Sequence, residues 1–282
     1  MQNWKLTVTY DGTAFAGWQV QPGLSTIQGE LQAAIRRILG RAWGEVPLPQ
    51  GSGRTDAGVH ALGQVASLAL EAPIPGENLL RALNRTLPAA IRVLSVEPVA
   101  AEFHARHSAV AKTYEYRIFR GALCSPFLAP YVHHCKWKLD LPLLHEAAAQ
   151  VIGEHDFTSL AATDADLTSR LEKDPELAAP SNIRTIFSSS WSESQGDLLV
   201  YRVRGNGFLH HMVRNLVGTM LEIARGQFPA GSMASIIEAQ ARSAAGPTAP
   251  ARGLFLHSVE YLPEDDSRDD QIGINLDQIQ SA

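Results

Sequence analysis

Hydrophobic and polar residues alternate at the start of the chain, from Leu6 to Tyr10. A period of two residues predicts a strand with one buried face. Apolar residues then recur at helical spacing over residues 27–39, after Ser25 and Gln28, which fit a capping box. The same patterns predict the other elements. Strands are expected near residues 64–70, 91–97, 112–119, 183–191, 199–204 and 254–261, and helices near residues 77–83, 143–152 and 209–224.

The order of these elements indicates an α+β fold. Runs of strands interrupted by single helices favour two α/β halves, each a mainly antiparallel sheet with helices on one face. We place the N-terminal half at residues 1–107 and the C-terminal half at residues 108–262. Acidic residues dominate the tail at 263–282 and the stretch 164–177. We expect a disordered extension and a surface insertion, respectively.

Length and composition describe a globular protein. The chain has 282 residues, of which 45% are hydrophobic and 19% charged, so it can bury substantial cores without a disulfide or metal. No apolar run reaches about 18 residues, which excludes a transmembrane helix. The N-terminus does not resemble a signal peptide. Cys124 and Cys135 are the only cysteines, which fits a reducing cytoplasmic location.

The distribution of charge leaves nucleic-acid binding open. The formal net charge is −5, and the tail 263–282 accounts for all of it. Without the acidic stretch 164–177 as well, the remaining chain is slightly basic. Most of the basic residues are arginine, which suits bidentate contact with phosphate. Composition therefore neither excludes RNA nor argues for it.

The segment from Gly51 to His60 is the most unusual part of the sequence. It lacks a glycine at position 56 for a dinucleotide fingerprint, and Val59 and His60 stand where a P-loop needs Lys and then Ser or Thr. What remains is Asp56, two residues from Arg54 and flanked by glycines. An ionised, positioned carboxylate could attack a sugar carbon or a conjugated ring. A turn aspartate bonded to its own backbone is the alternative.

Several motifs together resemble the tRNA pseudouridine synthase A (TruA) family. The run from Gly53 to Ala61 is similar to that family's active-site motif. Five other signatures follow the family's order, and the resemblance extends from about Lys5 to Tyr261. They lie at residues 10–12 with 15–21, 103–106, 112–116, 153–159 and 206–215.

This resemblance implies a function and a set of site residues. It implies isomerisation of uridine to pseudouridine at positions 38, 39 and 40 of the tRNA anticodon stem-loop, in a central RNA-binding cleft of the pseudouridine synthase fold. Asp56 would be the nucleophile and Arg214 its basic partner, Arg54 would fill the space left by the flipped base, and Tyr114 would contact the substrate. No metal or organic cofactor is implied. The resemblance also implies that the protein forms a homodimer that binds tRNA across both subunits.

The residues leave alternatives open. Asp56 could attack C1′, attack C6 or deprotonate C2′. A hydrolytic uracil N-glycosidase using the same carboxylate, or a non-catalytic tRNA-binding protein, are competing functions. By periodicity alone, Tyr114 would be a core residue and Arg214 a solvated helix charge.

Two other clusters of polar residues have simpler interpretations. Irregular spacing and the lack of a CxxC motif argue against a metal site formed by His104, His107, Cys124 and Cys135. His210 and His211 are expected about 100° apart on a helix, and so not on one face.

Overall fold

The computed structural model describes residues 1–40, 46–162 and 181–262. The acidic stretch 164–177 and the tail 263–282 lie outside these residues. The strands are β1 (Gln2–Tyr10), β2 (Gln50–Gly51), β3 (His60–Leu70), β4 (Ile91–Val99), β5 (Ala109–Phe119), β6 (His133–His134), β7 (Gly153–Asp156), β8 (Ile183–Ser194), β9 (Leu198–Gly205) and β10 (Leu254–Tyr261). The helices are α1 (Ile27–Leu39), α2 (Gly76–Thr86), α3 (Leu141–Ala149), α5 (Met212–Ala224) and α6 (Ser232–Glu238).

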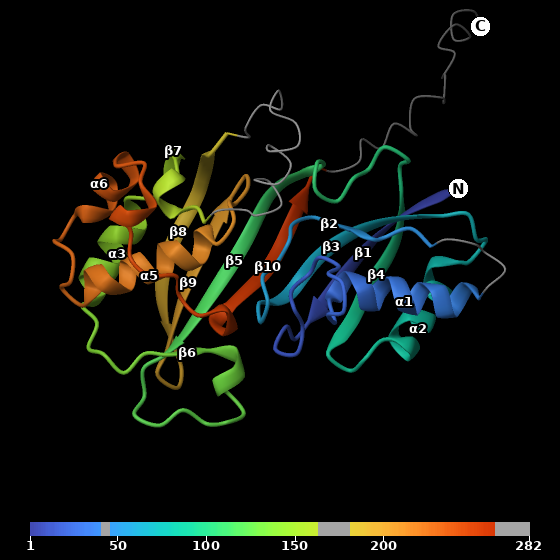
Figure 1. Cartoon of the computed structure of the whole chain (residues 1–282), viewed down its shortest axis with the longest axis horizontal. Helices are drawn as coiled ribbons and strands as arrows, with labels where there is room; N and C mark the ends of the chain where they lie inside the picture. Colours follow the sequence, from blue (N-terminus) through green and yellow to red (C-terminus); the bar gives the residue numbers. More distant parts are fainter. Residues whose placement is uncertain (41–45, 163–180, 263–282) are drawn as a thin grey trace, which may run out of the picture.

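One continuous sheet forms the centre of the molecule (Figure 1). Its order is β4-β1-β3-β10-β5-β9-β8-β7, with β2 paired to β3 and β6 paired to β5. Helices α1 and α2 lie with the N-terminal strands, and α3, α5 and α6 lie with the C-terminal strands. The α+β class and the mainly antiparallel sheet are confirmed. None of the helices in the described ranges is long and apolar enough to span a membrane.

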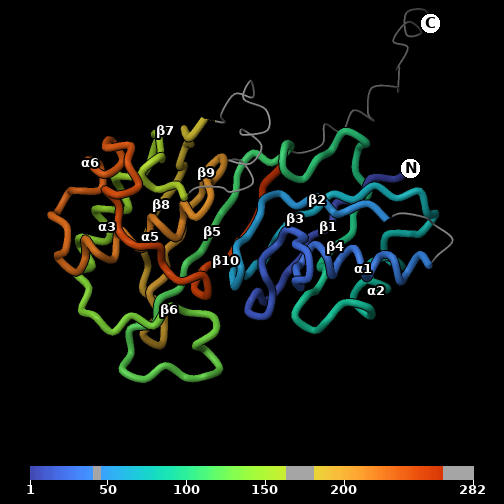
Figure 2. Tube along the Cα trace, in the orientation of Figure 1, coloured from blue at the N-terminus to red at the C-terminus, as the bar shows by residue number. Residues whose placement is uncertain are grey.

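The two expected sheets are joined edge to edge through β10. This strand follows all other elements of the described residues, yet it lies between β3 of the N-terminal half and β5 of the C-terminal half (Figure 2). It pairs with β3 in parallel, with Phe255 opposite His60 and Leu256 opposite Ala61. On its other side it is antiparallel to β5. The halves therefore share a hydrogen-bonded seam, the pairing of β10 with β3.

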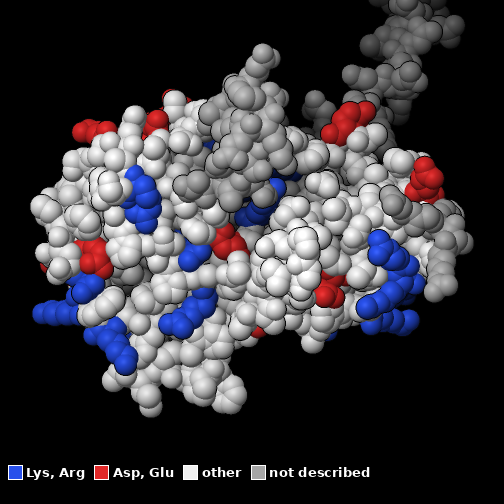
Figure 3. All heavy atoms as spheres, in the orientation of Figure 1, with Lys and Arg blue, Asp and Glu red and all other residues white. Residues whose placement is uncertain are grey.

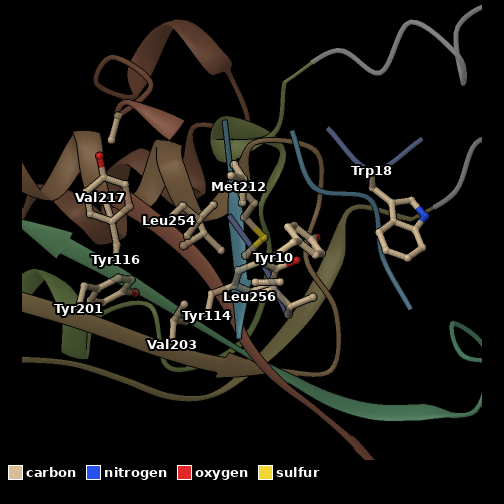
Figure 4. Close-up of a cluster of buried hydrophobic side chains, with 14 of the residues drawn as sticks. Tyr10, Trp18, Tyr114, Tyr116, Tyr201, Val203, Met212, Val217, Leu254 and Leu256 are labelled. Atoms are coloured by element: carbon tan, nitrogen blue, oxygen red, sulfur yellow. The ribbon is translucent and has the colours of Figure 1, made fainter. Parts of the chain in front are cut away.

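The side chains beside this seam form a continuous core. Figure 4 shows residues of the sheet meeting Met212 of α5, and Tyr10, Tyr114, Val203 and Leu256 are among them. All five are at least 92% buried. They come from both halves, since Tyr10 lies on β1 and Tyr114 on β5. Apolar packing at the seam thus stabilises the position of one half against the other.

The start of α1 differs from the expected capping box. Thr26 is the N-cap, and its hydroxyl accepts a hydrogen bond from the Gly29 amide. Ser25 instead donates to the Glu30 carboxylate. The Gln28 side chain is buried and accepts from the Val20 amide. The helix was predicted correctly, but its cap lies one residue later because Gln28 is used to hold the preceding loop.

Candidate active site

Asp56 lies on the loop between β2 and β3, here called the aspartate loop (residues 52–59). The N-terminal motifs predicted from the sequence pack directly against it. The Trp18 amide donates to the Thr55 carbonyl at 3.0 Å, and the Tyr10 hydroxyl is 2.8 Å from the Thr55 hydroxyl. Trp18 is 2% exposed, so it anchors this loop from within the core.

Two glycines allow this close packing. A Cβ at Gly12 would lie 1.9 Å from the Val59 carbonyl oxygen, and one at Gly17 would lie 2.6 Å from the Thr55 carbonyl oxygen. Gly17 also has a φ of 92°, in the region that favours glycine. The motifs at residues 10–12 and 15–21 therefore have a structural role, which is to support the backbone on either side of Asp56.

Arg214 contacts the Asp56 carboxylate from the other half of the molecule. Its Nη1 donates to Asp56 Oδ2 at 2.7 Å, and its Nε donates to the Ala249 carbonyl at 2.8 Å. The Arg214 side chain is 15% exposed and that of Asp56 22%. Periodicity alone suggested a solvated helix charge at position 214. The structure instead brings Arg214 and Asp56 together, as the family resemblance implied.

His210 and His211 also face Asp56, which contradicts the helical expectation. His211 Nε2 lies 3.2 Å from Asp56 Oδ2 and His210 Nε2 lies 3.6 Å from Oδ1. Helix α5 begins only at Met212, and His211 has a left-handed backbone with φ 58° and ψ 2°. The 100° separation of helical neighbours therefore does not apply, and both rings turn to one side, 4.0 Å apart.

Burial of the His211 ring lowers its pKa below the usual range, while the charge of Asp56 opposes that shift. His211 is therefore shifted towards the neutral imidazole beside the carboxylate. Residues other than glycine rarely adopt a positive φ, so the contacts around His211 must hold its backbone in this conformation.

Three donor atoms at this point could approach a metal ion. In the described ranges, Asp56, His210 and His211 are the only group of three such residues with ligand atoms within 4.8 Å of one another. Arg214, however, places a positive charge 2.7 Å from the same carboxylate, which opposes a second cation there. His104 and His107 lie close together, with rings 4.4 Å apart, but Cys124 and Cys135 do not join them in such a group.

Tyr114 lies on β5, which β10 separates from β3 in the sheet, on the face that the helices cover. It is 8% exposed and its ring meets Phe208 edge to face at 5.0 Å. Burial raises its pKa far above the usual range, and the charges of Tyr10 and Asp56 add to this shift. The hydroxyl is thus a proton donor near the Asp56 charge. Tyr114 is both a core residue and a residue of the site.

Two cationic residues lie at the aspartate loop: Arg54 belongs to it, and Lys112 contacts it from β5. The Arg54 side chain is exposed on the loop itself, two residues from Asp56. Lys112 Nζ donates to the Ser52 carbonyl at 2.5 Å, linking β5 to the loop. The sequence analysis did not single out Lys112 or Phe208. The signal for Lys112 was its place two residues before Tyr114, since alternate residues of a strand share a face.

His60, near the end of the motif at residues 53–61, has contacts that support the fold. Its Nδ1 accepts from the Gly12 amide at 3.1 Å, so its Nε2 carries the proton near the Pro130 carbonyl at 3.2 Å. Burial lowers the pKa of His60, against the opposing charge of Asp11. Burial, with the charges of Arg252 and His134, also lowers the pKa of His133 to about 4. Both imidazoles are therefore neutral in the folded protein at pH 7.

We expect the protein to lose stability as the pH falls below about 6.5, the pKa of histidine in an unfolded chain. Below that pH, His60 and His133 bind protons more readily in the unfolded chain than in the folded protein. Their contribution to the free energy of unfolding is therefore complete above about pH 6.5 and decreases on acidification. For His133 the loss continues down to about pH 4. Urea unfolding should show about 1 kcal/mol less stability at pH 5 than at pH 7.5 from His133, after allowing for partial exposure. The variant H133Q should show a smaller pH dependence, and an unchanged slope would contradict this assignment.

Comparison with known proteins decides the family. A family model described as tRNA pseudouridine synthase matches residues 6–108 and 147–262. A tRNA pseudouridine synthase A from Solibacter usitatus is 52% identical over 93% of this chain and 100% of its own length. The enzyme of that name from Limosilactobacillus fermentum is 40% identical over 96% of this chain and 100% of its own. The chain belongs to the tRNA pseudouridine synthase A family. As a member of it, the chain is an isomerase.

The family model matches a segment of each half, and both sides of the site lie within these segments. Its two matched segments contain Asp56 and Arg214, respectively. A tRNA pseudouridine synthase A from Bacillus pumilus is also similar. It is 41% identical, and the match covers 98% of its own length. These matches support the resemblance in the six motifs, and they extend over nearly the whole chain. The boundary between the halves near residue 107 stays a prediction.

Proposed function

We propose that this protein isomerises uridine to pseudouridine at positions 38, 39 and 40 of the tRNA anticodon stem-loop, with Asp56 as nucleophile. The observation that carries the proposal is the pairing of Asp56 with Arg214 beside Tyr114, at the seam between the halves. Family membership supports tRNA as the substrate. The shape of the anticodon arm, rather than base edges, would select neighbouring targets.

The chemistry needs a negative group at the nucleoside and no external reactant. The N1–C1′ bond breaks, a C5–C1′ bond forms, the C5 proton leaves and N1 gains a proton. The Asp56 carboxylate serves by attack at C1′, attack at C6 or removal of the C2′ proton, and these three routes remain open. The charge-assisted hydrogen bond from Arg214 at 2.7 Å stabilises and orients the carboxylate.

The other residues handle the extruded base. Flipping a base costs a few kcal/mol, and Arg54, which is exposed on the aspartate loop, would offset part of this cost by filling the vacated space. Tyr114 keeps its proton, so its hydroxyl can donate to the uracil while its ring borders the pocket. These residues act without an organic cofactor or metal in this proposal. The proposal also includes a cytoplasmic homodimer, in which tRNA binds across both subunits.

The test is to map the products in tRNA after incubation with the protein. We expect pseudouridine at positions 38–40 and no free uracil. An abasic site with released uracil would instead identify an N-glycosidase, since water would then have entered the reaction. Binding of tRNA without either product would identify a non-catalytic binding protein. RNA with 5-fluorouridine at the target should be trapped or processed abnormally, because the proton at C5 can no longer leave.

A further inference from the structure

Three cationic side chains come together beside Tyr114 without an acidic partner. They are Arg106, Lys112 and Arg184. Across residues 1–40, 46–162 and 181–262, none of the three forms an ion pair. Burial, together with the charges of Arg106 and Arg184, lowers the pKa of Lys112 to about 8. Arg106 also adds to the lowering of the Arg184 pKa that burial causes. These charges are thus close enough to repel one another.

Strand pairing explains why they meet. Lys112 is two residues before Tyr114 on the same face of β5, a distance of about 6–7 Å along the strand. It pairs with Gly205 of β9, and Gly205 pairs with Ile186 of β8. Arg184 is two residues before Ile186 and so lies on the same face of β8. Arg106 precedes β5 in the chain.

Glycines leave the space between these charges open. Gly53 faces the ammonium of Lys112, with a Cβ position 3.4 Å from Nζ. Gly207 faces Arg184, with a Cβ position 3.4 Å from Nε. Larger residues at these points would cover the charged groups, so the glycines keep them within reach of a bulky anion.

We propose that Arg106, Lys112 and Arg184 bind one backbone phosphate of the RNA next to the target nucleotide. The proposal rests on the proposed function. Lys112 lies only about 6–7 Å along β5 from Tyr114, so a phosphate bound there would lie next to the target nucleotide. Figure 3 shows Lys and Arg side chains on both halves in this view, with Asp and Glu side chains among them. A phosphate relieves the mutual repulsion of the three cations and releases counterions from the RNA.

Lys112 has a second connection that gives this site a consequence for catalysis. Its Nζ already donates one hydrogen bond to the Ser52 carbonyl of the aspartate loop, and an ammonium has three donors. A phosphate bound to the remaining donors connects the RNA backbone to the loop that carries Asp56. Binding of the strand beside the target thereby positions the nucleophile.

The test uses anticodon stem-loop RNA with single methylphosphonate linkages, each of which removes one charge, placed in turn around the target uridine. Wild-type protein should lose roughly tenfold in affinity at one linkage, the effect of one charge-assisted hydrogen bond. R184Q and R106Q should each bind unmodified RNA roughly tenfold more weakly and show a clearly smaller further loss at that linkage, since two of the three cations remain. R204Q is the matched control, because Arg204 lies on β9 and is already paired with Glu260 through two hydrogen bonds. It should keep the wild-type profile.

Each outcome separates this inference from the proposed function. If R184Q and R106Q keep the linkage profile of the wild type, or if no linkage stands out in the wild type, the phosphate site is overturned. If the wild type shows the expected profile but forms no pseudouridine, the proposed function fails and the phosphate site stands. Both arginine variants avoid Lys112, whose bond to the aspartate loop could affect folding.

Discussion

Replacing Asp56 by asparagine should abolish pseudouridine formation, lowering the single-turnover rate by roughly 10⁴-fold or more, as expected for loss of a nucleophile. The amide has the size of the carboxylate but carries no charge, so Arg214 also loses its ion pair. Affinity for tRNA should change by no more than about threefold, because phosphate contacts supply most of the binding energy. Release of tritium from tRNA labelled at uridine C5 measures the rate, and filter binding measures the affinity.

D197N is the control for this variant. Asp197 lies at an exposed turn between β8 and β9 with a φ of 60°, a conformation that asparagine also tolerates. Its substitution removes one acidic charge far from the site in sequence and should leave the rate unchanged. Parallel losses of binding and turnover in D56N would refute the separation of roles. Residual activity near the wild-type level would remove Asp56 from the chemistry.

Replacing Gly12 by alanine should give the largest loss of stability, about 3 kcal/mol or more. The added Cβ would lie 1.9 Å from the Val59 carbonyl oxygen, a backbone atom that can move only if the aspartate loop moves. The same shift would break the hydrogen bond from the Gly12 amide to His60. Urea unfolding should show the loss, and the displaced loop should lower the rate in protein that remains folded.

The substitution G23A is the comparison for G12A. Gly23 has a φ of 75° but nothing within 4 Å of its Cβ position, so alanine there costs only about 1 kcal/mol of backbone strain. A G12A protein as stable and as active as G23A would show that the loop tolerates the clash by a small movement. That result would contradict the supporting role given to the motif at residues 10–12.

Periodicity predicted the strands and helices well because burial follows the same period. In β1, buried residues alternate with partly exposed ones, as the alternation of Leu6 to Tyr10 required. The predicted helices differ from the structure only at their ends, where side chains have other partners, whereas the short helix α6 was not predicted. His211 adopts a left-handed backbone before α5, and no periodicity in the sequence signals that conformation. The cap of α1 was misplaced for the same kind of reason.

The site depended on information that local sequence does not contain. Asp56 and Arg214 are 158 residues apart, and their contact exists because β10 connects the halves. The family resemblance implied that pair, whereas spacing on α5 argued for solvent exposure. The place of β10 between β3 and β5 could not be deduced from its apolar pattern, since that pattern would suit any position in the sheet. The spacing of Lys112 and Tyr114 placed both on one face of a strand, but the bond from Lys112 to the Ser52 carbonyl depends on the fold.

The position of β10 has a consequence for how the protein is made. During translation, both sets of helices and strands leave the ribosome before residues 254–261, and the two sets have no shared hydrogen-bonded edge until that segment arrives. Each can collapse early on its own, but the halves that carry Asp56 and Arg214 are joined in one sheet only when that segment has paired. A nascent chain therefore lacks the pairings that join its two halves until residues 254–261 have been added.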